Sequence, residues 1–230
     1  MQGKKVQEIT QEQEEIPTDG FASWLRRTRQ AQRTKAGARV PCGACKACCT
    51  SSYFIHISPD ETETLTRIPQ ELLFPAPGLP KGHVLLGYDK NGHCPMFIDN
   101  KCSIYDDRPQ TCRTYDCRIF PATGLPAGSD KPMIAQQAGR WKFAFPTPQD
   151  HEHFLAVQAA ARFFREHAES FPAGFLPNNP IQQAAVALKV YEVFLPSTQE
   201  SNHGEHAALT HEIVEAIIAA YERFETGEKA

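Results

Sequence analysis

Eight cysteines, all between residues 42 and 117, are the residues of this chain best suited to chemistry. Four of them form the compact run Cys-x2-Cys-x2-Cys-Cys, and the other four follow singly. Thiolates gathered this closely usually hold a metal ion or an iron–sulfur cluster. The sequence therefore predicts a metal site whose ligands are Cys42, Cys45, Cys48, Cys49, Cys94, Cys102, Cys112 and Cys117.

The spacing of the first three cysteines favours an iron–sulfur cluster. Three thiolates two residues apart are typical of ferredoxin loops, in which a distant cysteine supplies the fourth ligand, whereas zinc ribbons use separated Cys-x2-Cys pairs. We expect a [4Fe–4S] cluster, with zinc as the alternative because four thiolates readily bind zinc. Cys49 cannot easily reach the same metal as Cys48, so it either serves a second metal or replaces Cys48 as a ligand.

Disulfide bonds are the alternative use of these cysteines. The first fifteen residues lack the apolar segment of a secretion signal, and no run approaches the ~18 apolar residues of a membrane helix. We therefore expect a cytoplasmic protein without a membrane partner. Since the cytoplasm is reducing, metal ligation is favoured over disulfides.

The order of the motifs resembles the YkgJ-like cysteine-cluster family, whose domain is described as zinc- or iron-chelating. The matching elements are Cys-x2-Cys-x2-Cys-Cys from Cys42, Cys-x-x-Phe-Ile from Cys94, and Cys-x-Ile-Tyr-x-x-Arg-Pro-x-x-Cys-Arg-x-Tyr-x-Cys from Cys102. The resemblance covers roughly residues 39–119 and implies chelation without naming a reaction. A similar region in bacterial flagellin lysine methylases is associated with an iron–sulfur cluster, which favours iron without implying methylase activity.

Two arginines, Arg108 and Arg113, flank Cys112 and belong to the resembling segment. Cations near thiolates lower the thiol pKa and offset the negative charge of the site. We therefore expect both arginines to lie around the cofactor, with Lys46 and Lys101 near other ligands. The alternative is ordinary ion pairing with Asp106, Asp107 or Asp116.

The histidines are weaker candidates for ligands. His93 precedes Cys94 and could bind metal or donate a proton, but a surface loop residue is the simpler interpretation. His56 lies in an apolar strand and is expected to be a core residue. The pair His203 and His206 has no cysteine nearby and is expected on the surface.

The net charge of −3 argues against a general nucleic-acid-binding protein. No Asp or Glu occurs between residues 20 and 59, however, and the stretch from Arg26 to Lys46 is basic. This stretch is either a solvated helix face and linker or a contact for an acidic protein partner or anionic ligand.

Short elements must position the cysteines. We predict strands over residues 53–57, 84–88 and 141–145 and a hairpin over 94–105, with Asp99-Asn100 at its turn and Cys94 and Cys102 on adjacent strands. Predicted helices are residues 20–32 capped by Thr18-Asp19, 58–67 capped by Ser58, a short helix carrying Cys112, and 151–168, 181–195 and 205–225. Residues 120–128 are predicted as a Pro/Gly loop.

These elements predict an α+β protein with an irregular cysteine-rich core, short strands and a C-terminal group of helices. We divide it into a mobile polar N-terminus with a basic helix (1–38), a metal-binding domain (39–148) and a helical extension (149–230). Glycine-rich nucleotide loops and the common hydrolase motifs are absent. Whether the protein is an enzyme stays open: the cluster is either redox-active or substrate-activating, or the metal is zinc that stabilises a structural or interaction module.

Overall fold

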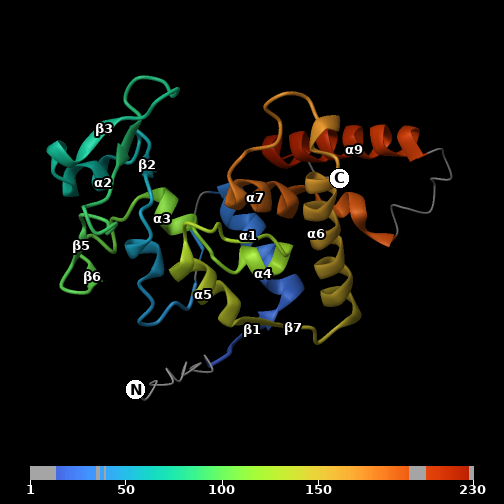
Figure 1. Cartoon of the computed structure of the whole chain (residues 1–230), viewed down its shortest axis with the longest axis horizontal. Coiled ribbons are helices and arrows are strands. Elements are labelled where there is room, and N and C mark those ends of the chain that lie inside the picture. The colour runs from blue at the N-terminus through green and yellow to red at the C-terminus, as the bar shows by residue number, and fades with distance from the viewer. Residues whose placement is uncertain (1–13, 35–36, 39, 197–205, 228–230) are drawn as a thin grey trace, which may run out of the picture.

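The computed structural model describes residues 14–34, 37–38, 40–196 and 206–227, so the predictions for residues 1–13 and His203 lie outside it. Two parts lie side by side (Figure 1). One, here called the strand lobe, comprises residues 53–112 and holds most of the short strands. The other, the helical part, comprises residues 16–34, 117–196 and 206–227. This arrangement of helices and small sheets confirms the α+β class.

The elements are short except in the C-terminal third. Among the described residues, the α-helices are α1 (Phe21–Thr34), α2 (Thr62–Arg67), α3 (Gln110–Thr114), α4 (Ile119–Thr123), α5 (Pro132–Arg140), α6 (Pro148–Glu166), α7 (Pro180–Val190) and α9 (His206–Thr226). The 3-10 helices are η1 (Ala47–Thr50), η2 (Gln70–Leu72), η3 (Ala168–Ser170) and η4 (Tyr191–Phe194). The strands are β1 (Ile16–Gly20), β2 (Ile55–Ile57), β3 (Leu73–Pro75), β4 (Val84–Leu86), β5 (Phe97–Ile98), β6 (Lys101–Cys102) and β7 (Trp141–Ala144).

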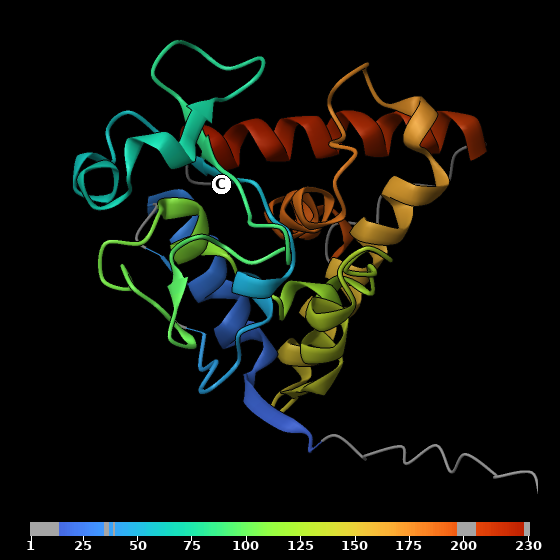
Figure 2. The same ribbon diagram turned by 60° about the vertical axis from the view of Figure 1, so that its left-hand side comes forward.

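The helical part has one hydrophobic core, which α1, α4, α6, α7 and α9 share. Apolar residues at helical spacing predicted the three C-terminal helices, and α6, α7 and α9 confirm them with boundaries shifted by a few residues. Figure 2 shows α9 crossing over α7, against which it packs. None of the described helices is long and apolar enough to cross a membrane.

The start of α1 differs from the sequence prediction. Thr18 and Asp19 do not cap the helix but lie in β1, which pairs in parallel with β7. The backbone N–H of Ala22 instead donates to Asp150 Oδ1 at 2.8 Å. Asp150 and Thr147 also form the capping box of α6. One buried carboxylate therefore joins the beginnings of α1 and α6.

The strand lobe is built on a three-stranded antiparallel sheet in the order β2–β4–β3. Ile57 and Leu86 of this sheet are almost completely buried in a second hydrophobic cluster, whose buried members are Ile55, Ile57, Ile68, Leu86, Met96 and Ile104. Such a small core stabilises a fold weakly by itself. The lobe therefore needs support from elsewhere, and its cysteines lie at this cluster.

The hairpin turn is confirmed and one of its cysteines is corrected. Asp99 and Asn100 both have positive φ, 49° and 62°, as the tight turn between β5 and β6 requires. Cys102 lies in β6 opposite Phe97, as expected. Cys94, however, precedes β5 by three residues, because the chain turns at Cys94–Phe97, where the Phe97 N–H donates to the Cys94 carbonyl at 2.9 Å.

The helix predicted from Ser58 begins later than expected. Residues 58–61 form a turn in which the Glu61 carboxylate accepts from the Ser58 backbone N–H, and α2 starts only at Thr62. Glu61 also accepts from the N–H of Gln110, so it joins this turn to the start of α3. That short helix carries Cys112, as predicted.

Two helices occupy segments in which none was predicted. Residues 119–123 form α4, which lies in the core and ends at Gly124 with φ 68°, so the segment 120–128 is only partly a loop. Residues 132–140 form α5, which begins with a proline at its first position. Both helices lie close to the cysteines described next.

Candidate metal centre

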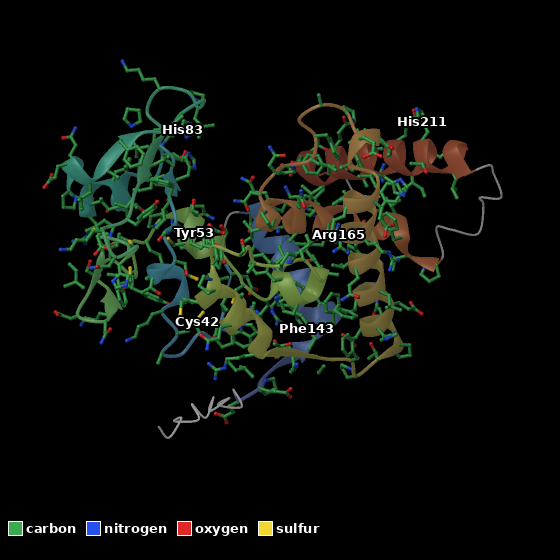
Figure 3. The ribbon with its side chains drawn as sticks, viewed as in Figure 1. Cys42, Tyr53, His83, Phe143, Arg165 and His211 are labelled. Carbon is green, nitrogen blue, oxygen red and sulfur yellow. The ribbon has the colours of Figure 1, made fainter. Side chains whose placement is uncertain are left out.

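The strongest electrostatic neighbours of the thiols, together with the hydrophobic clusters against which they pack, favour a division of the eight cysteines into two sets of four. The first thiol set consists of Cys42, Cys45, Cys48 and Cys117. The second thiol set consists of Cys49, Cys94, Cys102 and Cys112. Figure 3 shows Cys42 where the strand lobe meets the helical part.

The strongest electrostatic interactions of Cys48 and Cys49 support this division. The strongest thiol neighbour of Cys48 is Cys117, although 69 positions separate them in the chain. The strongest thiol neighbours of Cys49 are Cys94 and Cys102. Cys48 and Cys49 also interact with each other, and Cys49 interacts with Cys45 and Cys42, so the two sets adjoin at η1. The order of these neighbours favours Cys49 as a ligand of a second metal over Cys49 as a replacement for Cys48.

The backbone at residues 42–49 explains how the adjacent side chains of Cys48 and Cys49 point in different directions. The N–H of Cys45 donates to the Cys42 carbonyl at 2.9 Å, which closes a turn around the first thiol set. Cys48 and Cys49 lie in η1, a tight helix whose successive side chains point in different directions. The Cys49 carbonyl accepts from the Cys94 N–H at 2.8 Å, which fastens η1 to the second thiol set.

Hydrophobic packing supports the same division. Cys45 and Cys117 pack in the core of the helical part. Three members of the second thiol set, Cys94, Cys102 and Cys112, pack against the small cluster of the strand lobe. Each set therefore joins the chain run at residues 42–49 to a different hydrophobic cluster.

Burial raises the pKa of most of these thiols. The pKa rises to about 11 at Cys49 and to about 12 at Cys112 and Cys117, chiefly because burial disfavours the charged form. Neighbouring thiolates add to the rise at Cys49 and Cys112, whereas at Cys117 the Asp116 carboxylate adds more than the thiolates do and the Trp141 hydrogen bond opposes the rise. Cys48, whose residue surface is exposed but whose sulfur is crowded, has a pKa well above its ordinary value. A bound cation would relieve this repulsion, and binding would release protons.

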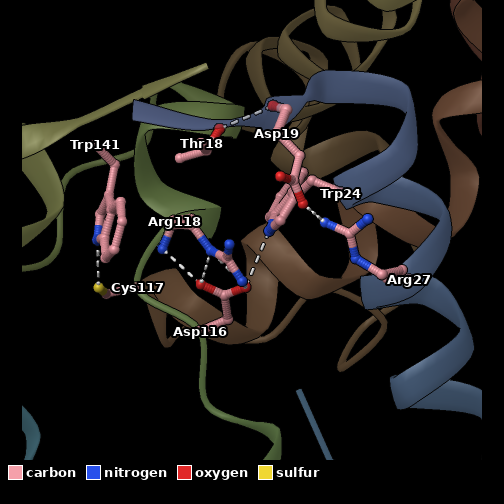
Figure 4. Close-up of polar contacts among 8 residues, drawn as sticks. All are labelled: Thr18, Asp19, Trp24, Arg27, Asp116, Cys117, Arg118 and Trp141. Carbon is pink, nitrogen blue, oxygen red and sulfur yellow. Dashed lines mark hydrogen bonds and ion pairs between the residues drawn. The ribbon is translucent and has the colours of Figure 1, made fainter. Parts of the chain in front are cut away.

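The surroundings of Cys117 include partners that no sequence motif marked. Trp141 donates its indole N–H to Cys117 Sγ at 3.3 Å (Figure 4). The neighbouring Asp116 is buried, pairs with Arg118 and accepts the indole N–H of Trp24 at 2.9 Å. These contacts hold the first thiol set against α1 and β7. Their residues come from distant segments, so spacing alone could not reveal them.

The two predicted cofactor arginines behave differently. Arg108 lies 4.0 Å over the Tyr105 ring. Burial raises the pKa of Cys42 and Cys112, one member of each set, and the charge of Arg108 offsets a small part of that rise. Arg113 lies 3.9 Å from Glu61. Neither arginine forms a described ion pair with the nearby aspartates, because Asp107 pairs with Arg67 and Asp116 with Arg118.

A pair of tyrosines lies between the two hydrophobic clusters. The hydroxyl oxygens of Tyr53 and Tyr115 are 3.2 Å apart, and Tyr53 packs against both clusters. Burial raises the pKa of both phenols, and Cys48 and Cys117 raise it further. Lys131 lies 4.9 Å above the Tyr53 ring. Both phenols are therefore neutral and polar, at the edge of the first thiol set.

The histidine predictions have separate outcomes. His56 has a polar partner, as predicted, with its Nε2 2.9 Å from Nδ1 of His83, but it is half-buried in the sheet and not in the core. The His93 ring packs edge-on against Phe97 at 5.9 Å. No contact of His93 with a thiol is described.

Cysteine thiols are suitable metal ligands, but in the described residues they are not yet close enough together to coordinate a metal ion. Within the described residues, no three His, Cys, Asp or Glu side chains are already arranged to hold a metal ion. All eight cysteines are free thiols. The two sets therefore bring the right ligands near each other, and binding of a single ion would require each set to close further.

A comparison with protein families agrees with the resemblance in the sequence. Residues 41–127 match the CxxCxxCC family model, described as "Putative zinc- or iron-chelating domain". This segment contains all eight cysteines and ends before the C-terminal helices. No curated protein and no solved structure matches the chain.

Proposed function

We propose that the protein binds metal at two centres, one on each thiol set. The single observation that carries this proposal is the division of the eight thiols into two groups of four. Four thiolates form the complete ligand set of a [4Fe–4S] cluster or of a structural zinc ion. The match to a zinc- or iron-chelating domain supports chelation and leaves the choice of metal open.

For the first thiol set we propose a [4Fe–4S] cluster. Its three cysteines at spacing Cys-x2-Cys-x2-Cys and its distant fourth member Cys117 follow the ferredoxin arrangement. Such a cluster supplies one-electron transfer, or substrate activation if one coordination position is open. Trp141 would hydrogen-bond to a cluster ligand, and Arg108 would offset the negative charge.

For the second thiol set the structure favours a stabilising role, with zinc or iron as the metal. Its members come from four separate elements and loops of a lobe whose hydrophobic cluster has only six buried residues. A structural zinc ion contributes on the order of 10–16 kcal/mol in small peptides. Metal at this position would fasten the hairpin and α3 to η1.

Two further parts of the proposal concern the compartment and the domain organisation. We place the protein in the reducing cytoplasm, where cysteines stay reduced and available to bind metal. We retain residues 39–148 as the chemically defined metal-binding region and residues 149–230 as its helical extension. The helices of the extension share a core with α1 and α4, so they should stay folded when a chelator removes the metal.

The test is elemental analysis and absorption of protein purified anaerobically after expression with iron and zinc supplied. We expect broad absorption near 400 nm from the first centre, bleached by air, and about two centres in total. Loss of metal should increase hydrogen exchange in the strand lobe while α6 and α7 stay protected. A colourless protein containing only zinc would refute the cluster, and a protein without bound metal would refute both centres.

A further inference from the structure

A cavity of about 470 Å³ lies in the helical part, between α1, α6, η4 and the C-terminal half of α9. None of its lining residues lies in the segment 41–127 that matches the chelating domain. Its walls are unusual because four arginines and two aromatic rings line it: Arg26, Arg29, Arg33, Arg223, Tyr191 and Phe224.

The cavity carries a net positive charge. Three of the arginines come from successive turns of α1, and Arg223 reaches it from α9. The carboxylate on its wall is Glu192, which pairs with Arg29. Within the described part of the chain, Arg26, Arg33 and Arg223 form no ion pair with a carboxylate. Four cations against one anion is an arrangement that favours binding of a ligand with more than one negative charge.

Contacts with two aromatic rings and a backbone carbonyl hold the Arg29 side chain in place. Its guanidinium lies 4.9 Å from the Tyr191 ring and 5.3 Å from the Phe224 ring, and one of its N–H groups reaches the Lys189 carbonyl. Its Nε is buried without a hydrogen-bond partner among the described residues. The contacts with the two rings fix the guanidinium at the wall of the cavity.

Tyr191 and Phe224 position the arginines of this site. Tyr191 and Phe224 are each only 5% exposed, and Arg33 also lies over Phe224, at 4.9 Å. Fixed planar guanidinium groups beside rings are well suited to phosphate, which they can bind through two parallel hydrogen bonds.

We propose that this cavity binds a small organic phosphate, with the phosphate against the arginines and its apolar group against Ala22 and Ala220 of the wall. The volume lies within the usual range of small-molecule sites. The basic stretch predicted over residues 26–46 thus contributes its helical half, at Arg26, Arg29 and Arg33.

The test is calorimetric titration of the full-length, metal-containing protein at constant ionic strength, with phenyl phosphate, inorganic phosphate and benzoate as probes. We expect saturable 1:1 binding of phenyl phosphate and weaker binding of the other two, which lack the ring or the second negative charge. Arg26→Gln and Arg223→Gln should each weaken phenyl phosphate about tenfold, since each removes a charged hydrogen-bond donor. Both side chains belong to exposed residues, so folding should be kept.

Arg27→Gln is the matched control, because Arg27 lies on the same helix, pairs with Asp19 and does not line the cavity. It should bind phenyl phosphate as the unchanged protein does. Absence of saturable binding, equal binding of benzoate, or the same loss in Arg27→Gln as in Arg26→Gln would overturn the proposal. Binding of an acidic peptide without binding of phenyl phosphate would overturn it in favour of a protein partner.

Discussion

Replacement of Asp116 should lower both the stability of the fold and the metal content of the candidate centre. Its carboxylate is 4% exposed and accepts hydrogen bonds from Arg118 Nε at 2.9 Å and from the Trp24 indole at 2.9 Å. Arg118 is 5% exposed, so this ion pair is buried. The next residue, Cys117, is the member of the first thiol set that comes from the far end of the cysteine region.

Asp116→Asn keeps the shape of the side chain and removes its charge. The Arg118 guanidinium would then lie in the core opposite a neutral amide. Breaking a buried pair in this way costs about 3–5 kcal/mol. For a chain of this size, that corresponds to a decrease in melting temperature of roughly 6–20 °C. Because the contact positions Cys117, we also expect the variant to retain less metal.

The assay is urea unfolding followed by circular dichroism, with metal content measured on the same samples. Asp107→Asn is the control, because Asp107 pairs with Arg67 at 3.0 Å on the surface, where an ion pair contributes less than about 1 kcal/mol. If Asp116→Asn destabilises the protein no more than Asp107→Asn does, the structural role given to the buried pair is wrong.

Two further substitutions test other contacts by urea unfolding. Trp141→Phe removes the hydrogen-bond donor to Cys117. We expect the free energy of unfolding to fall by about 1.5–3 kcal/mol with metal bound, because the sulfur is then a thiolate, and by only about 0.5–1.5 kcal/mol after the metal is removed. Equal losses would contradict a metal-bound sulfur. The Thr147 hydroxyl lowers the pKa of Asp150. Because this folded pKa lies below the unfolded value, the stabilisation is complete above about pH 4 and is lost as the pH falls through the folded pKa. Asp150→Asn should therefore be about 1–2 kcal/mol less stable at pH 7, with a smaller difference at pH 3, and a constant difference would refute this.

Local signals in the sequence predicted local structure well. Asp99-Asn100 predicted the turn because both residues tolerate positive φ. Apolar spacing predicted α6, α7 and α9 because a helix must bury one face. The helix start at Ser58 was wrong because Glu61 bonds back to the Ser58 N–H and keeps residues 58–61 in a turn.

The arrangement of the candidate site depended on contacts between distant segments. The cysteines could be recognised as ligands from their spacing, but their division into two sets depends on Cys117 returning to η1 beneath Trp141. The parallel pairing of β1 with β7 likewise joins segments more than 120 residues apart. Neither short strand alternates enough between apolar and polar residues for the sequence to predict its partner strand.

The central claim is that Cys48 and Cys49, adjacent in the chain, belong to different metal centres. Native mass spectrometry of Cys48→Ser, Cys49→Ser and selected double variants, purified anaerobically, tests it most directly, with far-UV circular dichroism as the control for folding. Each single variant should lose one centre, and a different one. Adding Cys117→Ser to Cys48→Ser should cost no further centre, whereas adding Cys112→Ser should leave none. Loss of the same centre in Cys48→Ser and Cys49→Ser would contradict the account.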